Sequence, residues 1–216
     1  MAYIFEEGGK VVVQIPHVAL EGGEVVERYI EVVADRGGKA LGGPYGSIQE
    51  AFLKALEDLS KTLTHAESFL DRVEYSLEAE ERIEPREIYT ASYMAHQLYY
   101  TASQLRQTAG ELLKRGFITY RQYVYAKSAA RKALALRRYA RDLRLLYASV
   151  VQLSLDASMR RLTWLGTVAI PAILISSLYG MNLSWLPLAD RPEAVFLLIA
   201  MATAGFAYFL RFKLKT

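Results

Sequence analysis

The residues best suited to bind an ion are neutral oxygen donors at the end of a long uncharged run. Gly180, Met181 and Asn182 follow an apolar stretch whose one ionisable side chain is Tyr179. Asn182 offers an amide oxygen and its own carbonyl, while Gly180 tolerates an unusual φ and frees its carbonyl where a helix ends. Such terminal carbonyls carry partial negative charge and favour cations. A helix-ending glycine followed by a turn asparagine explains the same residues, so both interpretations stay open at this point.

The uncharged stretch that leads to these residues predicts a helix that crosses a membrane. It begins after Arg160 and Arg161, and a second uncharged run, 194–210, follows a short loop. About 20 apolar residues cross a bilayer as a helix, and about 18 is the usual lower limit. The predicted segments are a first transmembrane helix at 162–180, a loop at 181–193, a second transmembrane helix at 194–212 and a basic tail at 213–216.

The distribution of charge orients this hairpin. The 216 residues carry a net charge of +3, and the basic residues gather on the approach to the first run and after the second. By the positive-inside rule, both termini are cytoplasmic and the loop faces outward, in the cell membrane. This distribution fits a membrane lipid surface better than nucleic acid, which we do not expect as a partner. The first residues lack a basic n-region and an apolar h-region, so we expect no signal peptide.

Other kinds of site find little support. The chain has no cysteine, which excludes disulfides and thiolate metal sites. His17, His65 and His96 have no metal-ligand spacing, and no Ser/His/Asp set or paired carboxylates stand out. We therefore expect neither a resident cofactor nor an enzyme.

Upstream of the hairpin, the pattern predicts a small strand-rich part and three helices. Residues 10–15 and 24–33 are rich in β-branched side chains, with the turn signal Gly22-Gly23 between them. Residues 47–50 and 119–122 have the sequence of helix capping boxes, and Pro85 suits the first turn of a helix. The predicted parts are a strand-rich cytoplasmic region at 1–46, an acidic helical hairpin at 47–118 and a stalk helix at 119–161.

The stalk helix should continue into the membrane without interruption. No glycine or proline occurs between Tyr120 and Gly166, and no obvious stop occurs before Gly180. A helix of that length spans about 90 Å, which exceeds any bilayer. One heptad stripe on it requires partner helices, which the two preceding helices supply in part. That stripe consists of Leu136, Tyr139, Leu143, Leu146, Val150 and Leu153.

A second stripe on the same helix mixes polar, small and apolar residues and runs unbroken from stalk to membrane. A lipid-facing stripe would be uniformly apolar, so this one should face protein or water. The second transmembrane helix has no polar stripe, and we place it outside any pore. The mixed stripe consists of Asp142, Leu145, Ser149, Gln152, Asp156, Met159, Thr163, Gly166, Ile170, Ile173 and Ser177.

The C-terminal part of the chain resembles the CorA family of divalent-cation channels. The resemblance covers roughly 150–212 and is carried by the segment 159–163, Pro171, the sequence Tyr-Gly-Met-Asn at 179–182 and Pro187. It implies an α-helical membrane protein with a small N-terminal α/β cytoplasmic part. The stalk helix would be continuous with the first of two transmembrane helices, and the assembly would be a funnel-shaped homopentamer.

The resemblance also implies a pore along the mixed stripe. Gly180, Met181 and Asn182 would form the selectivity loop that binds a hydrated ion, and Asp156 would form a ring at the inner mouth. The family usually has asparagine at that position, so a carboxylate ring would bind divalent ions more strongly. Ordinary helix packing is the alternative for the apolar members. The implied pore-lining positions are Met159, Leu162, Thr163, Gly166, Ile170, Ile173 and Ser177.

The resulting functional prediction is uptake of Mg²⁺, Co²⁺ or Ni²⁺ driven by the membrane potential. A Zn²⁺-transporting member of the same superfamily is one alternative, and the intact Tyr-Gly-Met-Asn sequence favours magnesium. A membrane-anchored scaffold or regulatory protein that has lost transport is another. The short soluble region motivates it, as do Ser184 and Leu188 in a loop where the family often carries acidic residues.

Overall fold

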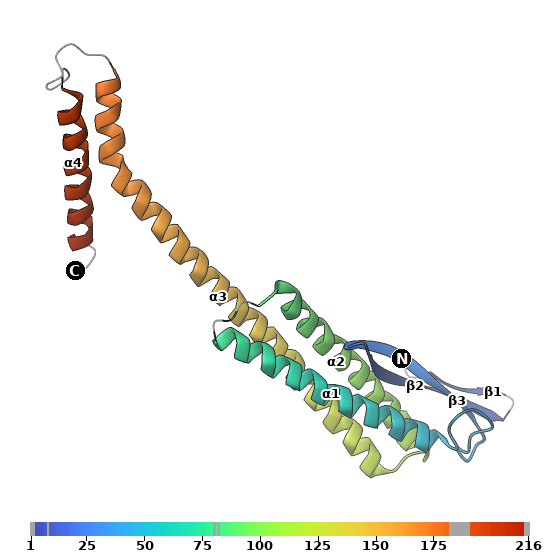
Figure 1. Ribbon diagram of the computed structural model, residues 1–216. Coiled ribbons are helices and arrows are strands. Elements are labelled where there is room, and N and C mark those ends of the chain that lie inside the picture. The colour runs from blue at the N-terminus through green and yellow to red at the C-terminus, as the bar shows by residue number, and fades with distance from the viewer. Residues whose placement is uncertain (1–2, 8, 80, 82, 182–190, 214–216) are drawn as a thin grey trace. The chain divides into compact units, whose positions relative to one another are not determined.

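The computed structural model describes residues 3–7, 9–79, 81, 83–181 and 191–213 (Figure 1). The chain divides into two compact units, Met1–Ala148 and Ser149–Thr216. The first unit holds the strands, two helices and the start of a third, and the second unit holds the rest of that helix and a fourth. The elements are β1 (Tyr3–Glu7), β2 (Lys10–Glu21), β3 (Glu24–Ala34), α1 (Ile48–Glu78), α2 (Pro85–Lys114), α3 (Tyr120–Gly180) and α4 (Pro192–Lys213).

The three strands form an antiparallel sheet in the order β1-β2-β3. Gly22 and Gly23 both have positive φ, as the tight turn between β2 and β3 requires. The register places Val13 opposite Val32 and Val11 opposite Ala34, and all four side chains are buried. Because side chains alternate along a strand, this pairing gives the sheet one apolar face, which packs against α1 and α2.

The predicted capping box at Thr119 forms in full, and the one at Ser47 forms with its reciprocal bond shifted to Gly46. Ser47 Oγ accepts from the Glu50 amide at 3.1 Å, and the Glu50 carboxylate accepts from the Gly46 amide at 2.7 Å. At the start of α3, Thr119 Oγ1 accepts from the Gln122 amide at 3.4 Å, while Gln122 Oε1 accepts from the Thr119 amide at 2.8 Å. Each box satisfies amides that a helix start leaves unpaired, so α1 and α3 begin where the sequence predicts.

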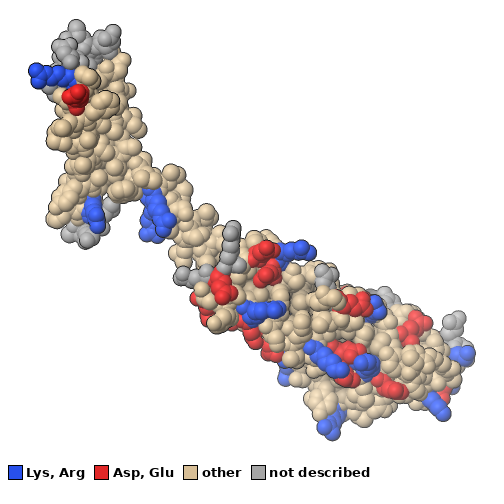
Figure 2. Space-filling view, viewed as in Figure 1, with Lys and Arg blue, Asp and Glu red and all other residues tan. Residues whose placement is uncertain are grey.

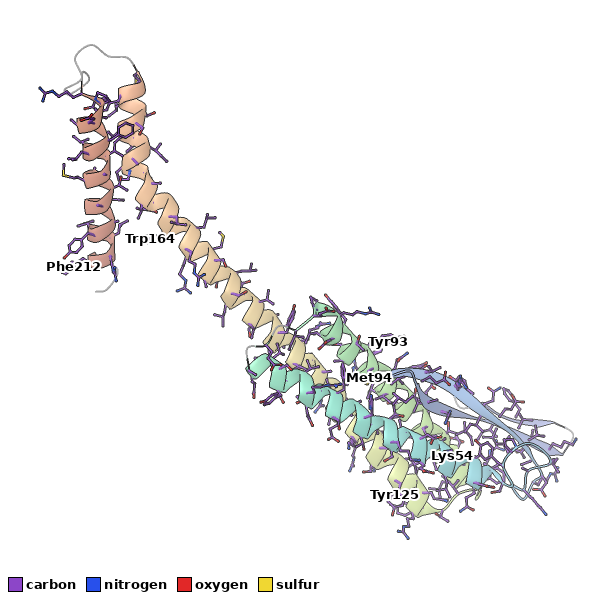
Figure 3. All side chains as sticks on the ribbon, in the orientation of Figure 1. Lys54, Tyr93, Met94, Tyr125, Trp164 and Phe212 are labelled. Carbon is purple, nitrogen blue, oxygen red and sulfur yellow. The ribbon has the colours of Figure 1, made fainter. Side chains whose placement is uncertain are left out.

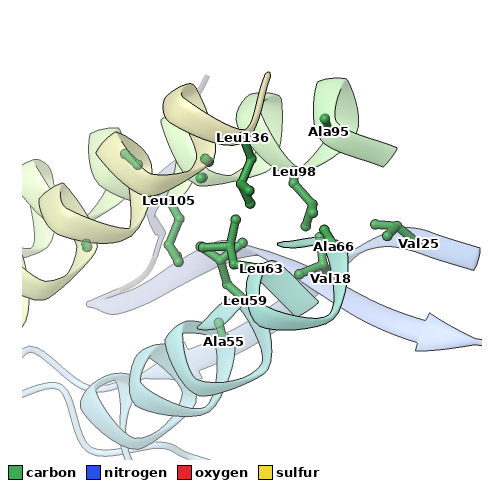
Figure 4. Packing of buried hydrophobic residues seen from close by; sticks show 14 of the residues in the cluster. Val18, Val25, Ala55, Leu59, Leu63, Ala66, Ala95, Leu98, Leu105 and Leu136 are labelled. Carbon is green, nitrogen blue, oxygen red and sulfur yellow. The ribbon is translucent and has the colours of Figure 1, made fainter. Parts of the chain in front are cut away.

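The core of the first unit is a seam of leucine, valine and alanine between the sheet and the three helices (Figure 4). On α1, Leu59, Leu63 and Leu70 are almost fully buried, as their spacing predicts. Alanine occupies many of the buried helix positions, and the backbones of α1 and α2 approach closely. The buried helix alanines are Ala51, Ala55, Ala66, Ala91, Ala95, Ala102, Ala109, Ala126, Ala130, Ala133 and Ala140.

The predicted heptad stripe on α3 divides into two parts. Leu136 and Leu143 are 4% and 2% exposed, so α1 and α2 do act as partners there. Further along α3, Val150 and Leu153 are 38% and 64% exposed. The same helix face is thus core at one end and uncovered at the other.

Two polar clusters fix α1 to its neighbours. Asp58 Oδ2 lies 2.9 Å from His17 Nε2 on β2, and Asp58 Oδ1 accepts from Lys54 Nζ at 2.8 Å. Tyr139 Oη on α3 donates to Asp71 Oδ1 at 3.1 Å and also contacts Glu74 on α1. Burial, followed by the adjacent carboxylates of Glu74 and Asp71, raises the pKa of the Tyr139 hydroxyl, which therefore remains a donor.

The Asp58 cluster predicts a pH-dependent contribution to stability. Burial acts to raise the Asp58 pKa, but the hydrogen bonds from Lys54 and His17 outweigh it and lower that pKa below 3.8. A lowered folded-state pKa means that the stabilisation is present above the unfolded value and disappears as pH falls through the folded value. We expect Asp58→Asn to destabilise the first unit by about 1–2 kcal/mol at pH 7, and by progressively less as the pH falls through the lowered pKa of Asp58.

Thermal melting followed by circular dichroism measures this difference. Glu57→Gln is the matched control, because that carboxylate pairs with Lys61 at 2.6 Å on the same helix but is solvent-exposed. The control should shift the melting temperature much less than Asp58→Asn. Equal shifts for the two variants at pH 7 would contradict a special contribution from Asp58.

Candidate functional site

The second unit contains two helices that are long and apolar enough to cross a membrane. The qualifying windows in α3 and in Pro192–Phe212 have mean hydropathies of 1.6 and 1.9, and 0% of either window is buried. A core helix of a soluble protein would be mostly buried, so these windows differ from that case. Figure 2 shows this unit with an uncharged surface except at its two ends.

The two helices of the second unit face each other along complementary stripes. On α3 the half-buried positions include Val168, Pro171, Ala172 and Ile175. On α4 they recur in pairs every four residues, which defines one helix face. These α4 positions are Ala194, Val195, Leu198, Ile199, Ala202, Thr203, Phe206, Ala207 and Leu210. Large apolar side chains such as Phe196, Leu197 and Phe209 occupy the opposite, exposed face of α4.

The predicted pore positions in the middle of α3 lie on a different face from the one that packs against α4. Gly166 and Ser177 are exposed, and Ile170 and Ile173 are 48% and 63% exposed. With 3.6 residues per turn, these four positions share a face that excludes Val168 and Ile175. The mixed stripe therefore remains uncovered in one protomer.

Earlier on α3, the predicted positions Asp156, Met159 and Thr163 line an open groove of about 690 Å³. Arg160, Trp164, Thr167 and Leu210 of α4 complete its lining, and we call it the inner groove. A stripe with spacing 3.5 drifts around a helix with 3.6 residues per turn, so its two ends face different directions. Figure 3 labels Trp164 and Phe212, which lie at the same end of the antiparallel pair.

The one carboxylate among the predicted pore positions is exposed. Asp156 Oδ1 accepts from Gln152 Nε2 at 3.1 Å, one turn earlier on α3. Leu162, also a predicted pore position, lies six residues further along α3 and is 66% exposed. Among the described residues, no three His, Asp or Glu side chains come together as a metal site in one protomer.

The selectivity loop is described only at its start. Gly180 is the last residue of α3, and its φ is not positive. A Cβ added at Gly180 would meet nothing within 4 Å. Met181 is exposed and its amide donates to the Leu178 carbonyl at 3.3 Å. Asn182 and the rest of the loop to Asp190 lie outside the described residues.

Proline within α3 adds a backbone acceptor to this site. Pro171 has no amide, so the Thr167 carbonyl lacks the donor that the helix would otherwise provide. The Thr167 hydroxyl donates to a different carbonyl, that of Thr163, at 2.8 Å. The helix nevertheless continues to Gly180.

Sequence reasoning missed the inner groove as a feature shared by both helices. The signal was present, because Asp156, Arg160, Trp164 and Thr167 recur at spacings of three and four. Only the position of α4 shows that Leu210 closes one side of it.

The fold combines a small α/β unit with two helices that are long and apolar enough to cross a membrane. The chain belongs to the CorA family, because the sequence model described as "CorA-like Mg2+ transporter protein" matches residues 21–215. That family comprises membrane-integral divalent-cation transporters, and its members are not enzymes. The match reaches well upstream of the C-terminal segment that carries the resemblance in the sequence.

Solved structures share the fold. The CorA magnesium transporter from Methanocaldococcus jannaschii has a TM-score of 0.64 and 15% identity, over 98% of this chain and 78% of that chain. The full-length CmaX protein has a TM-score of 0.66 and 16% identity, over 100% of this chain and 77% of that chain. No curated protein matched the sequence. These structures confirm the predicted fold class, apart from the pentamer.

Proposed function

We propose that the chain forms a homopentameric channel that imports Mg²⁺, and that the mixed face of α3 lines its pore. The observation that carries the proposal is the uncovered face of α3 from Gly166 to Ser177, on the side that does not pack against α4. A face that mixes glycine and serine with apolar residues suits contact with other helices or with water better than contact with lipid. Copies of α3 around an axis would cover it and enclose water.

The exposed part of α3 beyond the core supports self-association. Leu145, Leu153 and Leu155 are each more than half exposed, and Met159 follows on the same uncovered segment. Apolar residues gathered in this way on a soluble helix mark a surface that another protein covers. A second copy of the same segment is the partner that a symmetric channel provides.

In this proposal the hydrated ion is bound by neutral oxygens rather than stripped of its water. Magnesium dehydrates reluctantly, which favours a ring of amide and carbonyl oxygens at 180–182. The open space beside Gly180 leaves room for neighbouring copies to approach the axis. Once the path is open, an inside-negative potential favours entry by about 4.6 kcal/mol per divalent ion per 100 mV.

Both termini are proposed to be cytoplasmic, with two spans in the cell membrane. Arg160 and Arg161 precede the first span, and Arg211 follows the second, which satisfies the positive-inside rule. Figure 2 shows basic residues at both ends of the unit, together with an acidic one at a single end. The acidic residue beside Arg191 is Glu193, which belongs to the outer end in this topology.

Ion flux into proteoliposomes that hold a trapped indicator tests the proposal. Under an inside-negative potential, we expect Mg²⁺ influx well above that of protein-free liposomes. We also expect the influx to increase with the size of the potential. Parallel series with Co²⁺, Ni²⁺ and Zn²⁺, with and without a pH gradient, separate magnesium uptake from proton-coupled zinc transport. Absence of influx for all four ions, from folded oligomeric protein, would favour the scaffold alternative.

The carboxylate of Asp156 should determine how strongly internal Mg²⁺ opposes influx. A ring of carboxylates holds divalent ions at the inner mouth, so Asp156→Asn should release them more readily. We expect the internal Mg²⁺ concentration that halves influx to rise about tenfold, which corresponds to about 1.4 kcal/mol. Asp156→Glu retains the charge and serves as the control. An unchanged half-blocking concentration in Asp156→Asn would place this carboxylate outside the ion path.

A further inference from the structure

A second groove, in the first unit, is lined by positive charge and contains no carboxylate. It lies between α2 and α3 and has a volume of about 340 Å³. We call it the arginine groove. Its lining residues are Ser92, His96, Leu134, Arg137, Arg138, Ala140, Arg141 and Arg144.

The guanidinium groups of this groove are largely uncompensated. Among the described residues, Arg141 alone of the four forms an ion pair, at 3.0 Å to its chain neighbour Asp142, which does not line the groove. Arg137 lies over the Tyr99 ring, 4.7 Å from its centroid, and this contact holds its guanidinium in place. All four arginine side chains are solvent-exposed, so water screens their mutual repulsion, and a bound anion would supply the partner that three of them lack within the described residues.

A serine hydroxyl gives an independent indication of a ligand. Ser92 Oγ lines the groove, is shielded from solvent and has no hydrogen-bond partner within the described part of the chain. A shielded hydroxyl without a partner is unfavourable by about 1–3 kcal/mol, and native structures rarely leave one in that state. This hydroxyl is shielded in the groove as it stands, so it would donate to an anion held by the arginines after a rotation about χ1.

We propose that the arginine groove binds a small, multiply charged phosphate anion, such as pyrophosphate or the phosphate tail of a nucleotide. Guanidinium groups bind phosphate oxygens through paired N–H donors, which gives arginine its preference for such ligands. The volume is at the lower end of the range for small-molecule sites, which fits a compact di- or triphosphate group. Since the groove joins α2 to α3, the bound anion would link two helices of the first unit.

The test is isothermal titration calorimetry of the full-length protein in detergent with pyrophosphate, in metal-free buffer so that chelation has no effect. The double variant Arg141→Gln/Arg144→Gln should raise the Kd at least tenfold, and Ser92→Ala should raise it several-fold. Arg131→Gln is the matched control, since this exposed α3 arginine does not line the groove. At a hundredfold excess over Kd, pyrophosphate should raise the melting temperature by about 5–10 °C.

Titrations with ATP and with inositol trisphosphate identify the source of the phosphate group. Tighter binding of ATP would indicate a nucleotide, and tighter binding of inositol trisphosphate a lipid headgroup. No binding of pyrophosphate, or equal weakening by Arg131→Gln, would overturn the proposal. The proposal would also fail if the double variant bound pyrophosphate as tightly as the wild type and changed only the oligomeric state. That result would indicate that acidic residues of a second copy of the chain pair with these arginines.

Discussion

Substitution of Asn182 by alanine is expected to abolish most of the Mg²⁺ influx. In the proposed channel, each copy contributes one amide oxygen to a ring that contacts the hydrated ion. A hydrogen bond of this kind to a charged partner contributes about 1.5–3 kcal/mol, and its loss from several copies compounds. We expect influx to fall at least tenfold, since each 1.4 kcal/mol corresponds to a factor of about ten.

The matched control for this variant is Ser184→Ala, two residues further along the same loop. It removes a polar side chain of the loop without touching the Gly-Met-Asn sequence. We expect it to retain influx within about a factor of two. Both variants must show the oligomeric state and helix content of the wild type. Equal influx through wild type and Asn182→Ala would contradict the proposed filter and support a protein that has lost transport.

Substitution of Ile170 by serine is expected to raise the resting influx. In the proposed pore, Ile170 forms one of several apolar rings, and such a constriction opposes conduction because water leaves it. A ring of hydroxyls would remain wet, and the barrier to ion passage would fall. A tenfold increase in influx requires a reduction of only about 1.4 kcal/mol.

Leu165→Ser provides the comparison for the Ile170 variant. Leu165 is also a large, exposed apolar residue of α3. It lies five residues before Ile170 and therefore on a different face of the helix. We expect its influx to match the wild type. If both variants raised influx equally, the effect would reflect general loosening of the hairpin, and Ile170 would not be assigned to the pore.

Much of the fold follows from local sequence signals. The capping boxes at Ser47 and Thr119 place the starts of α1 and α3, because the side chains that form them are adjacent in the chain. The spacing of Leu59, Leu63 and Leu70 likewise predicts that their face of α1 is buried. The sequence did not separate Leu143, which is buried, from Leu153, which is exposed, because both satisfy the same heptad spacing and only the length of α1 and α2 distinguishes them.

Less of the candidate site than of the fold could be predicted from the sequence. The mixed stripe marks a face that avoids lipid, yet its drift around α3 brings Asp156 to the inner groove while Ile173 remains on the uncovered side. The arginine groove could not be found by spacing alone, because Ser92 and Arg141 are distant in sequence and meet only when α2 packs against α3.

The alanine contacts between α1, α2 and α3 determine what kind of movement the first unit permits. An alanine has no side-chain torsion to alter, so such a contact cannot adapt by changing rotamers, and ordering it incurs no loss of side-chain entropy. Helices joined in this way move by small sliding displacements of whole elements, the shear type of motion, rather than by local rearrangement. A bulky residue at Ala133 would therefore act as a wedge, and signals that enter the unit should travel along it as displacements of intact helices.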